Sequence, residues 1–299
     1  IGATAWLDRV QRGDGTGTDG PISEWVHKPC LVNERVQSGW CVPCGGGGIR
    51  PAGDDPSLGD TMCAFPDTAA LKAAVTACLS AVPSGEACCS TDTNCADPSS
   101  ARCGSAGCVD MPEWDVSLVT DMEGLFHDCP TGESWCGSVV VTTSALNQPI
   151  GSWNTARVTT MRTMFMDAVA FNQPIGSWNT SQVKNTAHMF RDATSFNQAI
   201  GAWDTSQVTD MYNMFLGATS FNRDISSWST SKVTDMNAMF YQATAFYQDI
   251  TGWTTTSLTT STGMFTGATA WLDRVQRGDG TGTSTDGPSS AWVPKPCLA

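Results

Sequence analysis

Large apolar residues return along this chain with a fixed step of 25 residues. Each repeat carries an isoleucine followed three residues later by a tryptophan, then a Met-Phe pair and an alanine. The tryptophan column comprises Trp153, Trp178, Trp203, Trp228 and Trp253. A repeat this short cannot bury its apolar face by itself, so the pattern predicts coils that are stable only when stacked on one another.

Two kinds of spacing alternate within each repeat, whose consensus is F-N-x-x-I-x-x-W-x-T-S-x-V-T-x-M-x-x-M-F-x-x-A. In the second half, apolar residues such as Val208, Met211 and Phe215 lie three or four positions apart, which predicts a short helical segment. The first half is a short apolar run that ends at a Thr/Ser turn, which predicts one parallel strand. Because parallel strands stack about 4.8 Å apart, about six coils would form a stub about 30 Å long. The expected fold class is an α/β-type repeat solenoid, leucine-rich-repeat-like, with one parallel strand plus a short helical segment per coil.

An asparagine recurs beside the phenylalanine, at Asn147, Asn172, Asn197 and Asn222. We expect these side chains to form a buried ladder in which each one hydrogen-bonds the backbone of the next coil. An earlier copy of the repeat lies at 114–126, and an insertion near 127–145 separates it from the regular array. We therefore place a solenoid of about six repeats at 111–270.

The units M-F-x-x-A-T-x-F-N-x-x-I-x-x-W-x-T-S-x-V-T-x-M resemble the repeats of the BspA-type leucine-rich-repeat surface proteins. The resemblance extends over about 111–270, more than half of the chain. It implies a right-handed solenoid, secreted or displayed on a surface, that serves adhesion or the building of walls and matrices. The family has no catalytic motif to transfer. The run Trp40-Cys41-Val42-Pro43-Cys44 also resembles the short cysteine-rich modules of extracellular receptors.

A second and longer repetition links the two ends of the sequence. Residues 2–30 reappear at 267–297, with an inserted Ser284-Thr285 and differences only at the positions of Ile22, Glu24 and His27. In the second copy this segment follows the last repeat of the array.

The duplication predicts how the chain is divided. We expect residues 1–30 to be the C-terminal cap and linker of a preceding unit and residues 271–299 to be the equivalent segment of this unit. Because Cys30 and Cys297 are 267 residues apart, the predicted precursor is a tandem of units of about that length.

Residues 31–110 are predicted to form a small disulfide-rich module that caps the start of the solenoid. Asp67 is a suitable N-cap for a helix over 68–80 that ends before Pro83 and presents Leu71, Val75, Cys78 and Leu79 on one face. The cysteines of this region are Cys30, Cys41, Cys44, Cys63, Cys78, Cys88, Cys89, Cys95, Cys103 and Cys108.

The chain has 13 cysteines, an odd number for a set of disulfides. Because Cys30 and Cys297 hold the same position in successive units, one full unit contains 12 cysteines, an even set. Cys129 and Cys136 are expected to pair across their insertion, and Cys297 is expected to find its partner beyond Ala299, in the next unit. A C-x-x-C spacing such as Cys41 to Cys44 also occurs at zinc sites, but no second pair accompanies it, so disulfides are favoured.

Composition and charge exclude several classes of partner. With 16 Lys+Arg against 29 Asp+Glu, the chain carries a net charge of −13, which is unsuited to nucleic acid and to anionic membrane surfaces. No apolar run approaches the roughly 18 residues that a membrane span needs. The many cysteines indicate an oxidising compartment, so we expect a secreted protein or one on the cell surface.

Residues that carry chemistry elsewhere form no catalytic pattern here. His27, His127 and His188 lie in different sequence contexts, and neither a G-x-S-x-G nor an H-E-x-x-H motif occurs. We therefore expect no enzymatic activity and no cofactor.

Two candidate sites remain. The glycine-rich stretches with Asp14, Asp19, Asp279 and Asp286 have the look of a calcium loop, but they lack the alternate carboxylates and final Glu of an EF-hand, so a flexible turn is favoured. Asn179-Thr180-Ser181 is the only N-x-[ST] sequon, and its position at a polar turn makes Asn179 a candidate for glycosylation.

Two functional hypotheses agree with these observations. The first is an extracellular structural protein, the repeating subunit of a surface fibre, sheath or hair in which neighbouring copies are joined head to tail. The second is a surface adhesin that binds polysaccharide or a partner protein through the solenoid face. Its variable positions are Gln173-Pro174, Gln198-Ala199, Arg223-Asp224 and Gln248-Asp249. Ice binding by the Thr columns is disfavoured because Arg157, Lys184 and Lys232 interrupt them.

Overall fold

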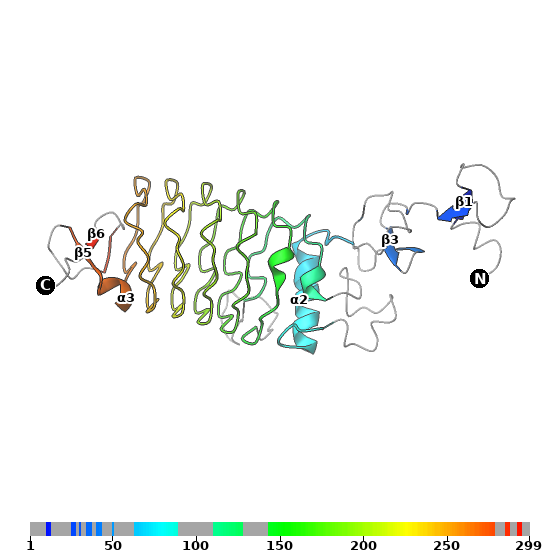
Figure 1. Cartoon of the computed structure of the whole chain (residues 1–299), viewed down its shortest axis with the longest axis horizontal. Helices are drawn as coiled ribbons and strands as arrows, with labels where there is room; N and C mark the ends of the chain where they lie inside the picture. Colours follow the sequence, from blue (N-terminus) through cyan, green and yellow to red (C-terminus); the bar gives the residue numbers. More distant parts are fainter. Residues whose placement is uncertain are drawn as a thin grey trace.

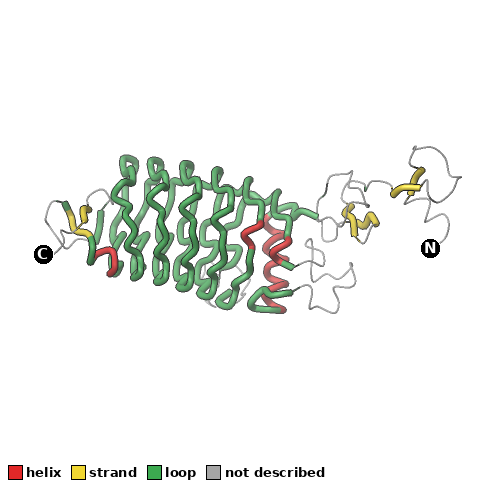
Figure 2. Tube along the Cα trace, in the orientation of Figure 1, coloured by secondary structure: helices red, strands yellow, loops and turns green. Residues whose placement is uncertain are grey.

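The structure is a computed structural model, and it describes residues 10–12, 25–27, 30, 34–37, 40–43, 50, 63–88, 110–127, 143–278, 285–287 and 292–294. Most of these residues belong to a row of similar coils, which we call the coil stack (Figure 1). The coils consist of loops and turns, and the helices lie at the two ends of the row (Figure 2). Of the helices that the structure describes, none combines the length and apolar character that crossing a membrane requires.

Hairpins and short helices accompany the coil stack. The antiparallel hairpins pair β1 (Val10–Arg12) with β2 (Trp25–His27), β3 (Glu34–Gln37) with β4 (Trp40–Pro43), and β5 (Val275–Arg277) with β6 (Trp292–Pro294). The α-helices are α2 (Thr68–Ala81) and α3 (Thr269–Leu272), and the 3-10 helices are η5 (Met111–Glu113) and η6 (Ile150–Ser152).

Neighbouring coils are joined by a ladder of backbone hydrogen bonds. Parallel bridges link, in this order, Asp121, Thr160, Asn185, Asp210, Asp235 and Thr260. After each bridge, alternate N–H groups donate to the following coil, as Phe190 does to Met214 O at 2.9 Å. The N–H groups between them close turns within their own coil, as Met189 does onto Thr186 O at 3.0 Å. Each coil is therefore held both to itself and to its neighbour.

The coils differ in two respects from the strand and helix expected in each repeat. The segment 208–218 consists of turns because its alternate N–H groups bond the next coil and are lost to the i−4 ladder of a helix. The parallel bridges lie in this same segment, at Asp210, and not in the F-N-x-x-I-x-x-W run. The leucine-rich-repeat-like class itself stays a prediction.

Two residues in each of these turns have a left-handed backbone conformation. One column comprises Thr163, His188, Asn213 and Ala238, and the other comprises Asp167, Asp192, Gly217 and Gln242. Gly217 has a φ of +68°, and a Cβ on it would lie 2.1 Å from Oδ1 of Asp192 in the preceding coil. Other coils have Asp or Gln at this left-handed position, so the short approach to Asp192 is what favours glycine at 217.

The core of the coil stack is built from aromatic columns. The tryptophan rings of neighbouring coils are nearly parallel, with centroids 6.5 Å apart for Trp178 and Trp203. A phenylalanine column runs beside them, with Phe190 and Phe215 5.6 Å apart. The indole N–H groups of the tryptophan column, from Trp153 to Trp253, are satisfied by the preceding coil, as Trp203 Nε1 donates to Ile175 O at 3.0 Å. Such aromatic pairs contribute about 0.5–1.5 kcal/mol each beyond their buried area.

The predicted asparagine ladder is present. The backbone N–H of Asn172 donates to Oδ1 of Asn147 at 2.9 Å, and Asn197 and Asn222 repeat this bond to the coil before them. The column ends at Tyr247, whose N–H donates to Asn222 Oδ1 at 3.2 Å. The side chains are half-buried or exposed rather than fully buried, so the ladder lies at the margin of the core.

Helix α2 covers the first coil, and its sequence prediction is confirmed. Asp67 caps it by accepting from Ala70 N–H at 2.8 Å, and Leu71, Val75 and Leu79 are buried. Phe65 packs on Trp114 with ring centroids 5.3 Å apart. Thr68 Oγ1 donates to Asp121 O at 2.6 Å. A disulfide joins Cys78 and Cys88, the two cysteines that flank the end of this helix.

Candidate assembly site at the C-terminal end of the coil stack

The C-terminal end of the coil stack begins as a further coil and then departs from the pattern. Trp271 in α3 continues the phenylalanine column, because its ring stacks on Phe265 at 3.7 Å as Phe246 does on Phe240 at 4.0 Å. Only 1% of Trp271 is exposed. The chain then leaves the coil path and forms β5.

The hairpin β5–β6 folds back over this last ring. Trp292 in β6 meets Trp271 edge-on at 4.8 Å and Phe265 at 5.7 Å, and it is 3% exposed. The hairpin lies against the terminal coil next to α3 (Figure 1). These three rings therefore close the apolar core that the last coil would otherwise leave open.

A short segment before β6 completes the backbone ladder. Within the coil stack, Phe240 N–H donates to Met264 O at 2.9 Å, and at its end Phe265 N–H donates to Thr285 O at 3.0 Å. The hydroxyls of Thr266 and Thr285 lie 2.6 Å apart, and Gly263 N–H donates to a carboxylate oxygen of Asp286. Thr285 and Asp286 thus take the place of a following coil.

Of the four residues proposed for calcium, the structure describes only Asp286. Asp286 uses a carboxylate oxygen for the Gly263 N–H. Asp14, Asp19 and Asp279 lie outside the described residues. Calcium at these positions stays a prediction, and among the residues described no group of three or more His, Cys, Asp or Glu side chains is arranged to hold a metal ion.

One further contact ties the cap to the side of the coil stack. The guanidinium of Arg274 lies 4.3 Å from the ring centroid of Tyr247, a cation–π contact. Tyr247 occupies the position at which earlier coils have the ladder asparagine, and 43% of it is exposed. A tyrosine replaces the asparagine at the last coil, where it contacts the cap.

The first copy of the duplicated segment contains the same hairpin. Strands β1 and β2 pair Val10 with His27 and Arg12 with Trp25. Strands β5 and β6 pair the corresponding residues, Val275 with Pro294 and Arg277 with Trp292. The first hairpin lies at the opposite end of the molecule from the second (Figure 1). The register is therefore the same in both copies, although two residues are inserted in the second.

A charged cluster, missed by sequence reasoning, lies on the turns of the earlier repeat copy and of the first two regular coils. Arg162 pairs with Glu123 of the preceding coil at 2.6 Å, and His127 Nε2 lies 3.6 Å from Asp167. Arg191 and Asp192 pair at 3.2 Å. The insertion near 127–145 hides this register, because it shifts His127 out of the 25-residue step.

Burial perturbs two groups of this cluster. Burial, helped by the positive charges of Arg191 and Arg162, lowers the pKa of His188 to about 4. Its ring meets Tyr212 edge-on at 4.8 Å. Burial and the nearby Asp167 carboxylate raise the pKa of Asp192, although its bond to Arg191 opposes the shift. His127 and His188 lie in different sequence contexts, yet the charge of His127 is a further and smaller cause of the lowered pKa of His188.

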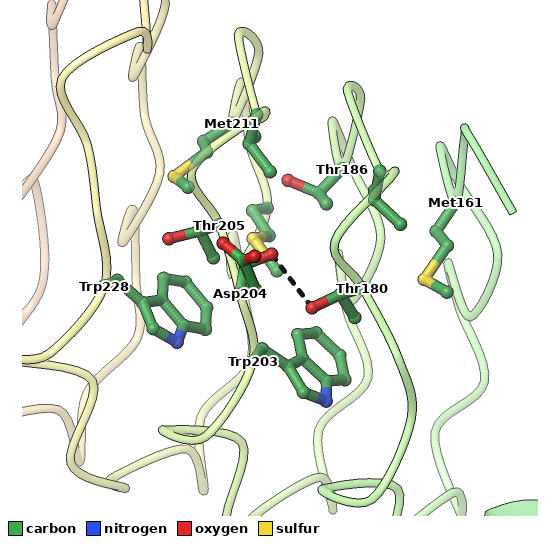
Figure 3. Close-up of a pocket in the computed structure, with 11 residues that line it drawn as sticks. Met161, Thr180, Thr186, Trp203, Asp204, Thr205, Met211 and Trp228 are labelled. Carbon is green, nitrogen blue, oxygen red and sulfur yellow. Dashed lines mark hydrogen bonds between the residues drawn. The ribbon is translucent and has the colours of Figure 1, made fainter. Parts of the chain in front are cut away.

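A small gap between coils has the character of core rather than of a ligand site (Figure 3). Its cavity volume is about 10 Å³, room for about one water molecule and far below that of typical ligand pockets. Its polar groups are already engaged, since Thr180 Oγ1 donates to Asp204 O at 3.0 Å. The lining residues are Met161, Thr180, Val183, Thr186, Trp203, Asp204, Thr205, Val208, Met211, Met214 and Trp228.

The glutamine and arginine positions named for an adhesin are used inside the protein. Gln198 Nε2 donates to Asn172 O at 2.8 Å, and Gln173, Arg223 and Gln248 make the equivalent bond to the asparagine of the coil before them. These side chains stabilise the ladder.

The remaining sequence candidates are placed in part. Asn179 is exposed, with Oδ1 accepting from Ser181 N–H at 3.1 Å, and its glycosylation stays a prediction. Cys30 and Cys63 are disulfide-bonded and buried. The side chains of Cys41 and His27 are not described, and Cys44, Cys89, Cys95, Cys103, Cys108, Cys129, Cys136 and Cys297 lie outside the described residues, so the pairing of these cysteines stays a prediction.

Comparison with known proteins identifies the coil stack. One family model, described as Mycoplasma protein of unknown function, DUF285, matches residues 104–202 and again residues 178–277. The two matches overlap by a single 25-residue repeat. No curated protein and no solved structure matches the chain.

Proposed function

This chain belongs to the DUF285 family, and from that premise we propose that it is an extracellular structural protein, the repeating subunit of a surface fibre, sheath or hair. Neighbouring units of about 267 residues, the distance from Cys30 to Cys297, follow one another head to tail. The role is mechanical rather than catalytic, and the cysteine content supports an oxidising location outside the cell.

The observation that carries the proposal is the duplicated cap. Residues 267–297 close the end of one coil stack with Trp271, Trp292 and Asp286. The same segment, with its hairpin in the same register, is present at 2–30. A second cap implies a second coil stack to be closed, and in a tandem each cap is the junction between two units.

The contacts within the coil stack support a rigid element. At nearly every repeated position, a residue of one coil contacts the next coil, through stacked aromatic rings, asparagine side chains or backbone N–H groups. In repeat arrays of this kind each repeat contacts only its neighbours, so the array can be lengthened without a change in fold. That is a suitable property for the subunit of an extended assembly.

Cleavage of the native material tests the proposal. Limited proteolysis followed by mass determination should release a ladder of fragments spaced by one unit, because the coil stacks resist cleavage better than the segments between them. A single product no longer than one unit, under conditions that leave the coil stack intact, would contradict it.

A second candidate, a surface adhesin, is favoured by one observation. Tyr212 is 37% exposed, and its ring meets His188, on which the charges of Arg162 and Arg191 act. Exposed aromatic rings in charged surroundings are suited to polysaccharide. A glycan array distinguishes this candidate. Binding that is lost in Tyr212→Ala supports it, whereas no binding by the native protein counts against it.

A further inference from the structure

We propose that residues 2–30 are a docking segment for the C-terminal end of the coil stack of a second copy of this chain. The inference rests on the proposed fibre function and adds to it the contact by which two copies recognise each other. It also assigns a role to each residue of the segment that makes this contact.

The apolar part of the contact is defined by the cap that the structure describes. Trp271 stacks on Phe265 at 3.7 Å, and Trp292 closes over both rings. The corresponding residues of the first copy are Trp6 and Trp25. Because the two copies share these tryptophans and the hairpin between them, the first copy has the groups needed to cover the same core.

The polar part of the contact is present in part. Thr285 and Asp286 accept from the N–H groups of Phe265 and Gly263, and the first copy keeps the aspartate as Asp19, whereas Thr285 belongs to the two residues inserted in the second copy. These acceptors satisfy backbone donors that an uncovered coil would leave unpaired.

The side of the coil stack adds a charged contact. Arg274 lies over the ring of Tyr247 at 4.3 Å, and its counterpart in the first copy is Arg9.

The residues that make the ring, carboxylate and guanidinium contacts described above are the same in both copies. The copies differ where Ile22, Glu24 and His27 replace Ser289, Ala291 and Pro294, and where Ser284-Thr285 is inserted beside Asp286.

The resident cap competes with an incoming segment for the same end. Residues 267–297 are attached to the coil stack they cover, so they act at a high effective concentration. A segment 2–30 from another copy therefore docks only where the resident cap is weakened or displaced. The resident cap therefore limits docking between intact chains.

Full-length variants test the inference directly. The receiver carries Trp271→Ala and Trp292→Ala, which weaken its own cap, and Trp6→Ala and Trp25→Ala, which prevent it from docking on itself. The donor is the unaltered chain. Sedimentation velocity of the mixture should show a one-to-one complex, while each chain alone sediments as a monomer.

A matched control donor carries only Trp6→Ala and Trp25→Ala. Buried tryptophans at such contacts contribute at least about 2 kcal/mol each, so each substitution should weaken binding at least about 30-fold. A second receiver, with Trp292→Ala as its only change to the resident cap, guards against misfolding of the first. The inference is wrong if neither receiver binds the donor, or if the control donor binds as well as the unaltered chain.

Failure of the docking inference can be distinguished from failure of the proposed function. A native proteolysis ladder without complex formation removes the docking inference alone. Complex formation without a ladder removes the tandem proposal and leaves the docking segment.

Discussion

The two ends of the coil stack are closed by different means. At the N-terminal end, helix α2 lays Leu71 and Leu79 on the first coil, and the Cys78–Cys88 disulfide fixes the chain just after the helix. At the C-terminal end, the closure consists of the rings of Trp271 and Trp292 and a few hydrogen bonds from residues 285–287. No disulfide of the described residues belongs to this second closure.

The difference gives the coil stack a polarity. The helical closure is made by a segment that occurs once in the chain, whereas the aromatic closure is made by a segment that occurs twice. Only the second end is thus closed by an element of which the chain carries another copy, which is the basis of the docking inference. Unlike ends of this kind favour head-to-tail rather than symmetric contacts.

The largest expected effect separates the ends most clearly. Trp271→Ala should cost about 3–5 kcal/mol, because it removes a ring that is 1% exposed and stacked on Phe265. Hydrogen exchange should localise the loss to the last coils, since repeats are coupled only to their neighbours. A loss below about 1 kcal/mol, or one spread evenly to α2, would contradict the described closure.

Removing the disulfide tests the other end. Replacing Cys78 and Cys88 together by Ser should cost about 2–3 kcal/mol, as expected for a closed loop of this length. The loss should appear in α2 and the first coil, as measured by hydrogen exchange, and leave residues 240–271 protected. Equal loosening of both ends would mean that they are not independent.

Acid should act on the interior between the two ends. Because the folded pKa of His188 is about 4, below its unfolded value of 6.5, the unfolded state binds the extra proton between these values. The contribution of His188 to the free energy of unfolding is therefore fully present above about pH 6.5 and is lost as the pH is lowered toward 4. At this half-buried site, where solvent screens the charges, the loss should be about 1–2 kcal/mol.

The matched variant for this prediction is His188→Asn. The next coil carries Asn213 at the same left-handed position, so the backbone is compatible with the change. Denaturant titrations from pH 7 to pH 4.5 should show a smaller loss of stability in the variant. The raised pKa of Asp192 acts in the opposite direction and remains in both proteins. An unchanged slope in the variant would remove His188 as the cause.

The polar part of the aromatic closure should contribute less. Asp286→Ala should cost about 1 kcal/mol, because the N–H of Gly263 loses a charged acceptor at an exposed position. Asp273→Ala, at another exposed carboxylate of the same segment, is the control and should change stability by less than about 0.5 kcal/mol. Equal losses in the two variants would show that the Asp286 contact is not specific.

The smallest effect is a gain. Ala238 has a φ of +47°, where an L-residue is strained, so Ala238→Gly should stabilise the protein by about 0.5 kcal/mol after the entropic cost of glycine. As an interior change, it should raise the thermal midpoint without altering the order in which the ends open. Destabilisation on this substitution would contradict the left-handed turn.

Much of this arrangement could be predicted from the residue columns. The 25-residue step identifies the buried tryptophans and phenylalanines, and the asparagine ladder and the α2 helix were also within reach of sequence. These features depend on contacts between identical positions of successive repeats. A single repeat therefore contains the information for all of them.

Other features depend on backbone geometry that the residue types do not reveal. The spacing of Val208, Met211 and Phe215 suits a helix and a turn equally, and left-handed positions occupied by Thr163 and Ala238 lack the usual glycine signal. The pairing of Thr285 and Asp286 with the last coil was also missed. This pairing forms because the chain leaves the coil path at β5 and comes back to the last coil at residues 285–287, outside the repeated sequence.

Electron microscopy of the native assembly tests the central claim most directly. The account predicts a filament with a constant axial period longer than about 30 Å, the length of about six coils at strand spacing. Separate compact particles without any axial repeat would contradict it.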